Sequence, residues 1–184
     1  MSRPAVSEMV RKMNDAGLVK MKGNSINLTS KGAKLANQVV RRHRLAERFL
    51  TDVLGLSWAE AHHEAGKWEH VVSPRVEAAF LKLLEDPTTC PHGNPIPGSD
   101  YQTPEGTSAL AEITVGNEVV IERIPEELEF HPGLHEFLEE SNLIPGEIGS
   151  VTAVSPDGTT TVDVKGRQVG VGAFASQRIL VCAP

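Results

Sequence analysis

Histidine and carboxylate side chains recur at helical spacing in two short segments of the chain, around Glu47 and around Glu69. His43 precedes Glu47 by four residues, so in a helix both side chains project from the same face. Imidazole nitrogen together with carboxylate oxygen is a donor set that suits a divalent transition metal. The same spacing also suits an ion pair between the two side chains. The pattern therefore predicts a metal site and leaves a salt bridge as the alternative.

The composition is that of an ordinary globular protein, with 40% hydrophobic and 23% charged residues among 184. This length suits one large domain or two small ones. No apolar run approaches the roughly eighteen residues that cross a bilayer, and no signal-peptide pattern opens the chain. Cys90 and Cys182 do not form a disulfide framework. We therefore expect a cytoplasmic protein with no membrane partner.

Positive charge is concentrated in the first fifty residues, which hold eleven Lys and Arg side chains against three acidic ones. The remaining 134 residues hold seven basic and twenty-one acidic side chains, so the net charge of −6 combines a basic end with an acidic remainder. A basic end can contact nucleic acid, and it can equally be a solvated helical face. Charge alone does not decide between these two interpretations.

Apolar periodicity and capping residues predict a mainly helical first half. A helix opens at Ser2 and ends before Gly17, and a small hairpin occupies residues 18–28. Three further helices are expected: a long one from Thr29 or Ser30 to Leu54, one from the capping box at Ser57 to Val72, and one over 73–85.

The second half is predicted to be a small β domain. Residues 86–106 contain five prolines and three glycines and mark the boundary. Many short strands within about 80 residues indicate a small barrel, interrupted by one short helix near 132–141. The expected strands are 113–124, 149–154, 159–164, 168–171 and 178–181.

The first helix and hairpin resemble the recognition helix and wing of a winged helix-turn-helix, which places helix residues in the major groove and a basic wing on phosphate. Two helices normally precede the recognition helix, and here the chain starts at position 1. An amphipathic helix and hairpin of an ordinary α+β protein is the alternative.

Taken together, these features resemble the diphtheria-toxin-repressor family of iron- and manganese-dependent transcriptional regulators. Five motifs carry the resemblance, in order and with compatible gaps: SRPAVS at 2–7, DAGLV at 15–19, HRLAER at 43–48, WEH at 68–70 and GNPIPG at 93–98. The implied architecture is a partial winged helix lacking its first two helices (1–30), a helical metal-binding and dimerisation domain (31–95), a linker (96–108) and an SH3-like domain (109–184).

The resemblance implies two neighbouring metal sites, of which His43 and Glu47 match the first. In the iron-responsive branch His62 completes that site together with two side chains of the SH3-like domain. Those two align best with Glu126 and Glu129, which also suit a solvated acidic loop.

In part of the manganese-responsive branch, a Cys-Pro-His-Gly segment completes the same site, and Cys90 and His92 match its ligands. This chain contains both sets of candidates. Which set closes the site stays open.

The resemblance assigns Glu69 and His70 to the second site. The family has a Cys or Glu three residues before this Glu, where this chain has Gly66, and a further ligand comes from upstream of the present sequence. Glu64 or His63 can substitute. A helical glycine costs about 1 kcal/mol relative to alanine. Since Gly66 occupies the position that separates the iron and manganese branches, the expected cofactor is Mn²⁺ or Fe²⁺, with other divalent ions possible in vitro.

The implied function is a metal-dependent regulator that binds a palindromic DNA operator as a homodimer. The alternative is a truncated metal-sensing dimer with little or no DNA binding. By resemblance, Ser2, Pro4, Ala5, Ser7 and Glu8 match the base-facing positions, and Arg3, Lys12, Lys20 and Lys22 are candidate phosphate contacts. Dimer contacts are expected around Leu50, Val53, Leu54, Trp58, Val71 and Val72.

An enzyme is not expected, and neither is a small-molecule substrate. His63 and Glu64 begin like the zincin motif, but Lys67 stands where the second histidine is needed. No nucleophile elbow or phosphate-binding glycine loop is present. Three histidines are expected to be exposed and one cysteine to be a buried strand thiol: His63, His131 and His135, and Cys182.

Overall fold

The first group of elements is helix α1 (Arg3–Asp15) with the hairpin of β1 (Val19–Lys22) and β2 (Ser25–Leu28). The computed structural model describes residues 2–23, 25–128 and 131–184. The Ser2 side chain accepts from the Ala5 N–H at the start of α1, as predicted. Gly17 ends it with a φ of +70°, which favours glycine. Within the described residues α1 buries no side chain.

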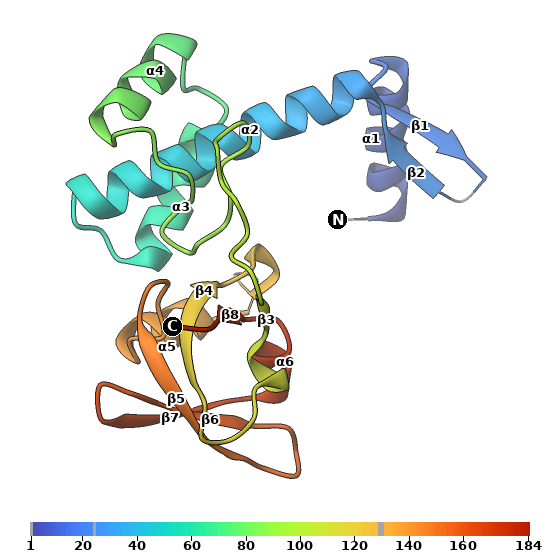
Figure 1. Ribbon diagram of the computed structural model, residues 1–184. Helices are drawn as coiled ribbons and strands as arrows, with labels where there is room; N and C mark the ends of the chain where they lie inside the picture. Colours follow the sequence, from blue (N-terminus) through green and yellow to red (C-terminus); the bar gives the residue numbers. More distant parts are fainter. Residues whose placement is uncertain (1, 24, 129–130) are drawn as a thin grey trace.

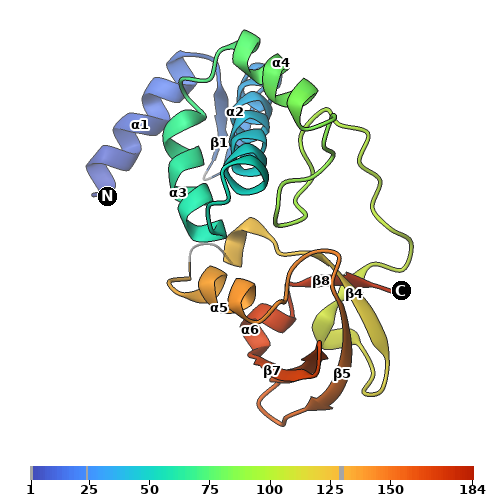
Figure 2. The same ribbon diagram turned by 90° about the vertical axis from the view of Figure 1, so that its left-hand side faces the viewer.

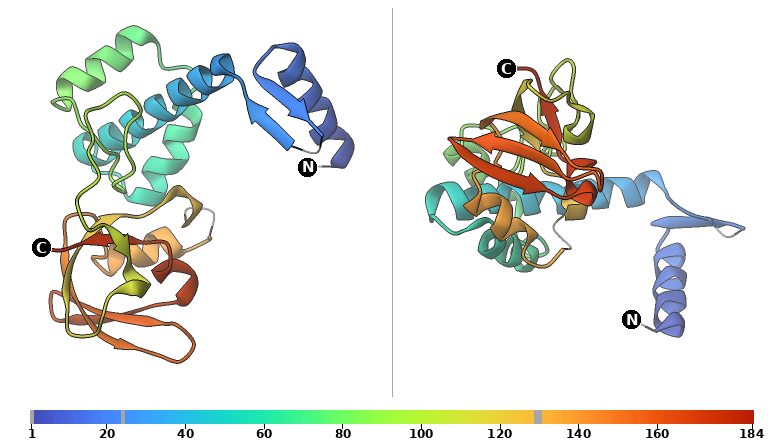
Figure 3. Two further views of the ribbon diagram at one scale, coloured as in Figure 1. Left: turned by 45° about the vertical axis from the view of Figure 1, so that its right-hand side comes forward. Right: turned by 90° about the horizontal axis from the view of Figure 1, so that it is seen from below.

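Helix α2 (Ser30–Arg48) is a continuous rod that carries this hairpin at one end and the helical domain at the other (Figure 1). The chain crosses closely at Gly32, where a Cβ would lie 1.9 Å from the Leu18 carbonyl oxygen. The predicted continuation to Leu54 is present, but as a π-helical turn, η1 (Phe49–Val53). Figure 3 shows α1 and the hairpin standing apart from the other elements at the end of α2.

Helices α3 (Trp58–Trp68) and α4 (Pro74–Leu83) complete the helical domain. The predicted capping box at the start of α3 is confirmed, but the predicted end at Val72 is wrong. Val72 is 7% exposed and packs in a cluster with Leu45 and Phe80, and the next residue, Ser73, already has the extended conformation that caps α4. Residues 69 and 70 therefore follow α3 instead of lying within it.

The C-terminal half forms an antiparallel sheet in the order β3-β8-β4-β5-β6-β7. The predicted run over 113–124 shortens, because residues 114–117 form a turn with Gly116 at a φ of +93°. Helix α6 (Ala173–Ser176) was not predicted. The other elements are β3 (Ser108–Ala109), η2 (Leu110–Glu112), β4 (Glu118–Arg123), η3 (Glu126–Leu128), α5 (Leu134–Glu140), β5 (Ile148–Val154), β6 (Thr160–Val164), β7 (Arg167–Val171) and β8 (Leu180–Cys182).

The helical domain and the sheet domain share contacts, with α5 lying beneath α3 (Figure 2). Trp58 of α3 belongs to the sheet domain's core, and its backbone N–H donates to both carboxylate oxygens of Glu139 on α5. The Ile124 N–H donates to the His92 carbonyl over 2.8 Å. These contacts hold the 85–107 loop, which carries Cys90 and His92, between the two domains.

The predicted fold class, mainly α with a small C-terminal β domain, is confirmed. None of the helices in the described part of the chain has both the length and the apolar composition of a membrane span.

Candidate metal centre

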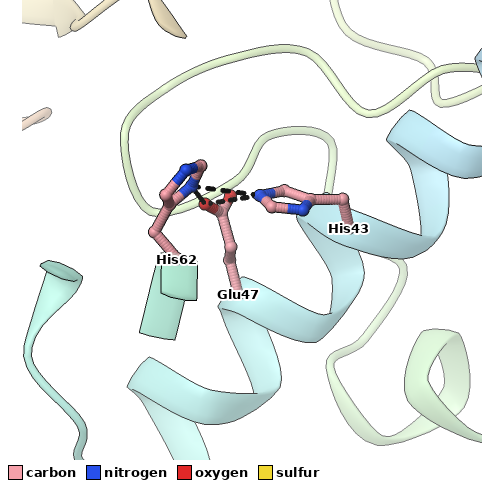
Figure 4. A group of neighbouring side chains, drawn as sticks. All are labelled: His43, Glu47 and His62. Carbon is pink, nitrogen blue, oxygen red and sulfur yellow. Dashed lines mark hydrogen bonds and ion pairs between the residues drawn. The ribbon is translucent and has the colours of Figure 1, made fainter. Parts of the chain in front are cut away.

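Two imidazoles, from two helices, converge on one carboxylate oxygen of Glu47 (Figure 4). His43 and Glu47 come from adjacent turns of α2, and His62 comes from α3. Glu47 Oε1 lies 3.1 Å from His43 Nε2 and 2.9 Å from His62 Nδ1, and the two nitrogens are 3.1 Å apart. The structure thus brings together the predicted His43, Glu47 and His62.

A second triad shares the same carboxylate oxygen, Glu47 Oε1. His92 Nδ1 lies 3.7 Å from Glu47 Oε1, and Cys90 Sγ lies 3.7 Å from His92 Nδ1. A turn shapes the loop, because the Cys90 N–H donates to the Asn94 carbonyl and Gly93 adopts a φ of +80°. A Cβ on Gly93 would lie 2.2 Å from the Glu122 carbonyl oxygen. The loop is therefore shaped to hold Cys90 and His92 against Glu47.

Burial and charge make this cluster unusual. Glu47 is only 2% exposed. Burial opposes ionisation of Glu47, but hydrogen bonds with His43, His62 and His92 hold its pKa well below the usual range. Burial likewise opposes a charge on His43, but the carboxylates of Glu47 and Glu69 raise its pKa to about 9. Burial also raises the pKa of the Cys90 thiol well above its usual value. Without an ion, the cluster is held by protonated His43 and ionised Glu47.

The donor set fits a divalent transition metal. Adjacent ligands around an octahedral ion with bonds of about 2.1 Å lie about 3 Å apart, which is the separation within the first triad. Imidazole and carboxylate suit manganese and iron, and the thiol of Cys90 adds a softer donor. Within each triad the donor atoms all lie within 4.8 Å of one another. The five side chains do not form one such group, so Glu47 joins two overlapping ligand sets.

Glu69 and His70 are placed at the edge of this cluster. Glu69 Oε2 lies 2.7 Å from His43 Nδ1, and Glu69 Oε1 lies 3.2 Å from His70 Nε2. The His70 side chain is 67% exposed. Gly66 is exposed and a Cβ there would meet nothing within 4 Å. Of the predicted substitutes for this position, Glu64 is paired with Lys67 at 2.6 Å, and His63 is exposed.

Of the two predicted ligands of the C-terminal domain, Glu126 is described by the structure and belongs to neither triad. Glu126 Oε1 accepts from Arg44 over 2.6 and 3.0 Å, and its side chain is 44% exposed. Glu129 lies outside the described residues. Cys182, predicted to be a buried strand thiol, ends β8 and is only partly buried.

The sequence interpretation of His135 as an exposed residue is wrong. His135 is 5% exposed, and its ring lies parallel to that of His92, with centroids 4.7 Å apart and planes at 20°. It lies on the short helix α5, 43 residues beyond His92. A pattern within one helix could not have identified it. The only sequence signal was an imidazole in a segment with apolar neighbours Leu134 and Leu138.

The candidate DNA contacts all lie on the exposed surface of α1 and the hairpin. Within the described part of the chain, no ion pair is formed by Arg3, Lys20 or Lys22. Glu8 pairs with Arg11 at 2.8 Å and lies 3.7 Å from Lys12. The candidates in these exposed positions are Ser2, Arg3, Pro4, Ala5, Ser7, Glu8, Lys12, Lys20 and Lys22.

The basic residues of the second half of α2 are occupied within the protomer. Arg41 and Arg42 both pair with Glu77, at 2.9 and 3.1 Å. Arg48 pairs with Asp52 at 3.1 Å. Among the described residues, these three arginines are therefore paired inside the protomer, unlike Arg3, Lys20 and Lys22.

The predicted dimer contacts divide into two groups. Leu50, Trp58 and Val72 are buried within the protomer and belong to its cores. Val53, Leu54 and Val71 are 48%, 53% and 76% exposed. The second group can contact another molecule, and the first cannot.

Two family descriptions cover most of the chain. Residues 29–98 match the iron dependent repressor, metal binding and dimerisation domain, and residues 109–182 match the FeoA domain. The first of these regions contains both triads, and the second contains the sheet domain.

Individual relatives extend the similarity to the rest of the chain. The iron-dependent repressor IdeR of Mycobacterium leprae is 39% identical over 178 aligned positions, which cover 91% of this chain and 77% of the relative. The diphtheria toxin repressor of Corynebacterium jeikeium is 49% identical over 100 positions, which cover 54% of this chain and 42% of that protein.

Solved structures show the same fold. A manganese-dependent transcriptional repressor in complex with manganese superposes with a TM-score of 0.84 at 33% identity, covering 100% of this chain and 86% of the other. The manganese regulator SloR has a TM-score of 0.76 at 30% identity, covering 100% and 85%.

Proposed function

The chain belongs to the iron-dependent repressor family, and from this membership we propose that it is a transcriptional repressor whose binding to duplex DNA requires Mn²⁺ or Fe²⁺ at the cluster around Glu47. This membership confirms three predictions from the sequence. They are the family itself, the presence of a metal-binding domain, and a regulator instead of an enzyme. The proposal goes further in its ligands, its operator and its mechanism.

The observation that carries the proposal is the shared, buried carboxylate of Glu47. Its 2% exposure in the middle of three imidazoles is costly unless it is paired or ligated. Both candidate ligand sets meet at this one side chain, so its neighbours must adjust together when an ion is held there. His43 gives up its proton on binding, as a histidine ligand must.

The positions of the candidate ligands support a route by which an ion could act on the proposed DNA-binding end. His43 and Glu47 lie on α2, which continues to the hairpin, whereas His62 lies on α3 and Cys90 with His92 on the loop against the sheet domain. A divalent cation held there would supply positive charge between these donors. His43 and Glu47, held together with donors from α3 and the loop, would then fix the direction of α2 relative to the rest of the molecule.

We further propose a homodimer on a palindromic operator. Closed two-fold symmetry is the commonest arrangement of soluble oligomers, and two recognition helices then meet half-sites about one helical turn apart. The exposed residues of α1 would face base edges, with Lys20 and Lys22 of the hairpin on phosphate. The pairs that Glu8 makes with Arg11 and Lys12 offset its charge near DNA.

Fluorescence anisotropy with duplexes selected from a random pool tests the proposal. We expect binding in Mn²⁺ or Fe²⁺ to be at least about tenfold tighter than in chelator, within the usual range of coupling between sites, and the selected duplexes to contain inverted repeats. Glu47→Gln should remove the response to metal. Asp52→Asn, which removes an exposed carboxylate just beyond α2, should retain it.

Equal affinity for DNA in the presence of metal ion and in the presence of chelator would contradict the regulator proposal. Metal binding without any DNA binding favours the alternative, a metal-sensing dimer. This alternative has one observation in its favour, because Val6 and Met9 on α1 are 46% and 45% exposed and leave an apolar surface uncovered among the described residues.

A further inference from the structure

His135 is a buried histidine of the C-terminal domain, and it lies beside the cluster around Glu47. It lies near the start of α5, and its ring stacks on His92. Its centroid is 5.9 Å from that of His62, with the rings almost perpendicular at 86°. Trp58 forms a further wall at 6.3 Å. The ring thus lies beside one histidine from each of the two triads.

The burial of this imidazole lacks a structural explanation. His135 is 5% exposed, and its Nε2 atom is buried with no hydrogen-bond partner among the described residues. Burying a polar atom without a partner costs about 1–3 kcal/mol. Phenylalanine or leucine would fill the same space without that cost. A ligand role gives the nitrogen the partner that the protein alone does not.

Glu126, the other candidate donor of this domain, is paired with Arg44 and belongs to neither triad. Both contacts between Arg44 and Glu126 use the same carboxylate oxygen, and this pair joins α2 to the sheet domain. Among the described imidazole and carboxylate side chains of the C-terminal domain, His135 is the one that is both buried and in ring contact with a member of a triad.

We propose that His135 is a ligand of the divalent transition metal held by Glu47, Cys90 and His92. One ion would then join α2, the 85–107 loop and α5. This inference rests on the proposed metal-dependent function. His135 belongs to neither triad as the structure stands. Coordination therefore requires its ring to move from the face of His92 towards Glu47. Gly133, with a φ of +79°, directly precedes α5.

Metal titration of two matched variants tests the proposal. His135→Phe keeps a flat ring against His92 and removes both nitrogens, whereas His131→Phe makes the same change at an exposed histidine of the same domain. With Co²⁺ and Mn²⁺ as probes, we expect His135→Phe to lower affinity about tenfold or more, the scale of losses at residues that support metal sites. His131→Phe should stay within about twofold of the unaltered protein.

A second measurement needs no substitution. In the ¹¹³Cd²⁺-loaded protein, the ring protons of each ligating histidine couple to the cadmium nucleus, and we expect such coupling for His135. Its absence, or unchanged affinity in His135→Phe, overturns the proposal. The two proposals fail in different ways. If the unaltered protein binds none of these ions, the proposed function fails as well. If it binds them without coupling to His135, only the present inference fails.

Discussion

At the scale of single residues, Glu47 is the side chain shared by both triads of the proposed metal centre. Its Oε1 atom lies 3.1 Å from His43 Nε2, 2.9 Å from His62 Nδ1 and 3.7 Å from His92 Nδ1. A buried carboxylate among imidazoles leaves a net buried charge whenever one partner is removed, and such losses are strongly destabilising. Substitutions in the cluster therefore need readouts that separate metal binding from folding.

Cys90 offers such a readout, because a thiolate bound to Co²⁺ gives a charge-transfer absorption in the near ultraviolet. Burial raises the pKa of the Cys90 thiol, so the thiolate forms only when an ion displaces the proton. We expect the Co²⁺-loaded protein to show this band and Cys90→Ser to lose it. Cys182→Ser, at the end of β8, should keep it. A band that survives in Cys90→Ser would remove Cys90 from the ligand set.

His43 makes the cluster dependent on pH in two opposite ways. Its pKa is raised from 6.5 to about 9, so the stability that it contributes to the ion-free protein is fully present below pH 6.5 and is lost as the pH rises through 9. Thermal unfolding in chelator should show a falling Tm between pH 6.5 and 9. Affinity for Mn²⁺ should rise over the same interval, because fewer protons must be displaced.

The matched variants for this measurement are His43→Gln and His63→Gln. The first should flatten the fall in Tm, and the second, which removes an exposed imidazole of α3, should preserve it. A fall of equal size in both variants would assign the pH dependence to other groups.

The sequence could predict the part of the cluster that lies within one helix. His43 and Glu47 are recognisable because their spacing follows the helical repeat. His135 could not be recognised in this way, since its contact with His92 depends on how the sheet domain docks against α3. Glu126 was matched to the ligand role by position, but the structure gives its carboxylate to Arg44, a partner 82 residues away.

At the scale of elements, α3 shows where local signals are sufficient and where they are not. The Ser57 and Glu60 side chains fix its start through a capping box that is visible in the sequence. Its end depends on Val72, which turns into the core formed with Leu45 and Phe80. Local helix propensity carries no information about this packing between distant residues. The start of α3 was therefore predicted correctly, and its end was not.

Two helical glycines should respond in opposite directions to the same substitution. Gly66 in α3 is exposed with open space around its Cβ position, so Gly66→Ala should stabilise the protein by about 0.5–1 kcal/mol. For a protein of this size that corresponds to a rise in Tm of about 1–4 °C. Gly32→Ala should destabilise it strongly, because the new Cβ would meet the Leu18 carbonyl oxygen.

Differential scanning calorimetry of the ion-free proteins measures both effects. A Gly66→Ala variant that unfolds at lower temperature would indicate that the glycine is needed for a backbone conformation other than the helix of α3. A Gly32→Ala variant with unchanged Tm would contradict the close approach of α2 to Leu18, the residue before β1.

At the scale of the whole molecule, the exposed apolar residues of the helical domain are the candidates for contact with a second copy. Leu54 is 53% exposed after η1, within the region that matches a metal-binding and dimerisation domain. We expect Leu54→Asp to weaken the dimer at least about tenfold, because a buried leucine contributes about 1.5–3 kcal/mol and a buried carboxylate adds a penalty. Analytical ultracentrifugation measures this change.

Val154 provides the control for this experiment. It is 48% exposed but lies at the end of β5 in the sheet domain. Val154→Asp should leave the association unchanged. A monomer produced by Val154→Asp, or a dimer that resists Leu54→Asp, would move the interface to the sheet domain.

The continuity of α2 has a mechanical consequence. Thirteen residues separate Ser30, beside the hairpin, from His43, which at 1.5 Å per residue is a lever of about 20 Å. If α2 tilts by about 10° at His43 and Glu47, its end at Ser30 moves by about 3.5 Å, which is close to the rise of one base pair. A small rearrangement of side chains around an ion would thus move the hairpin end of α2 by about the spacing of one base pair.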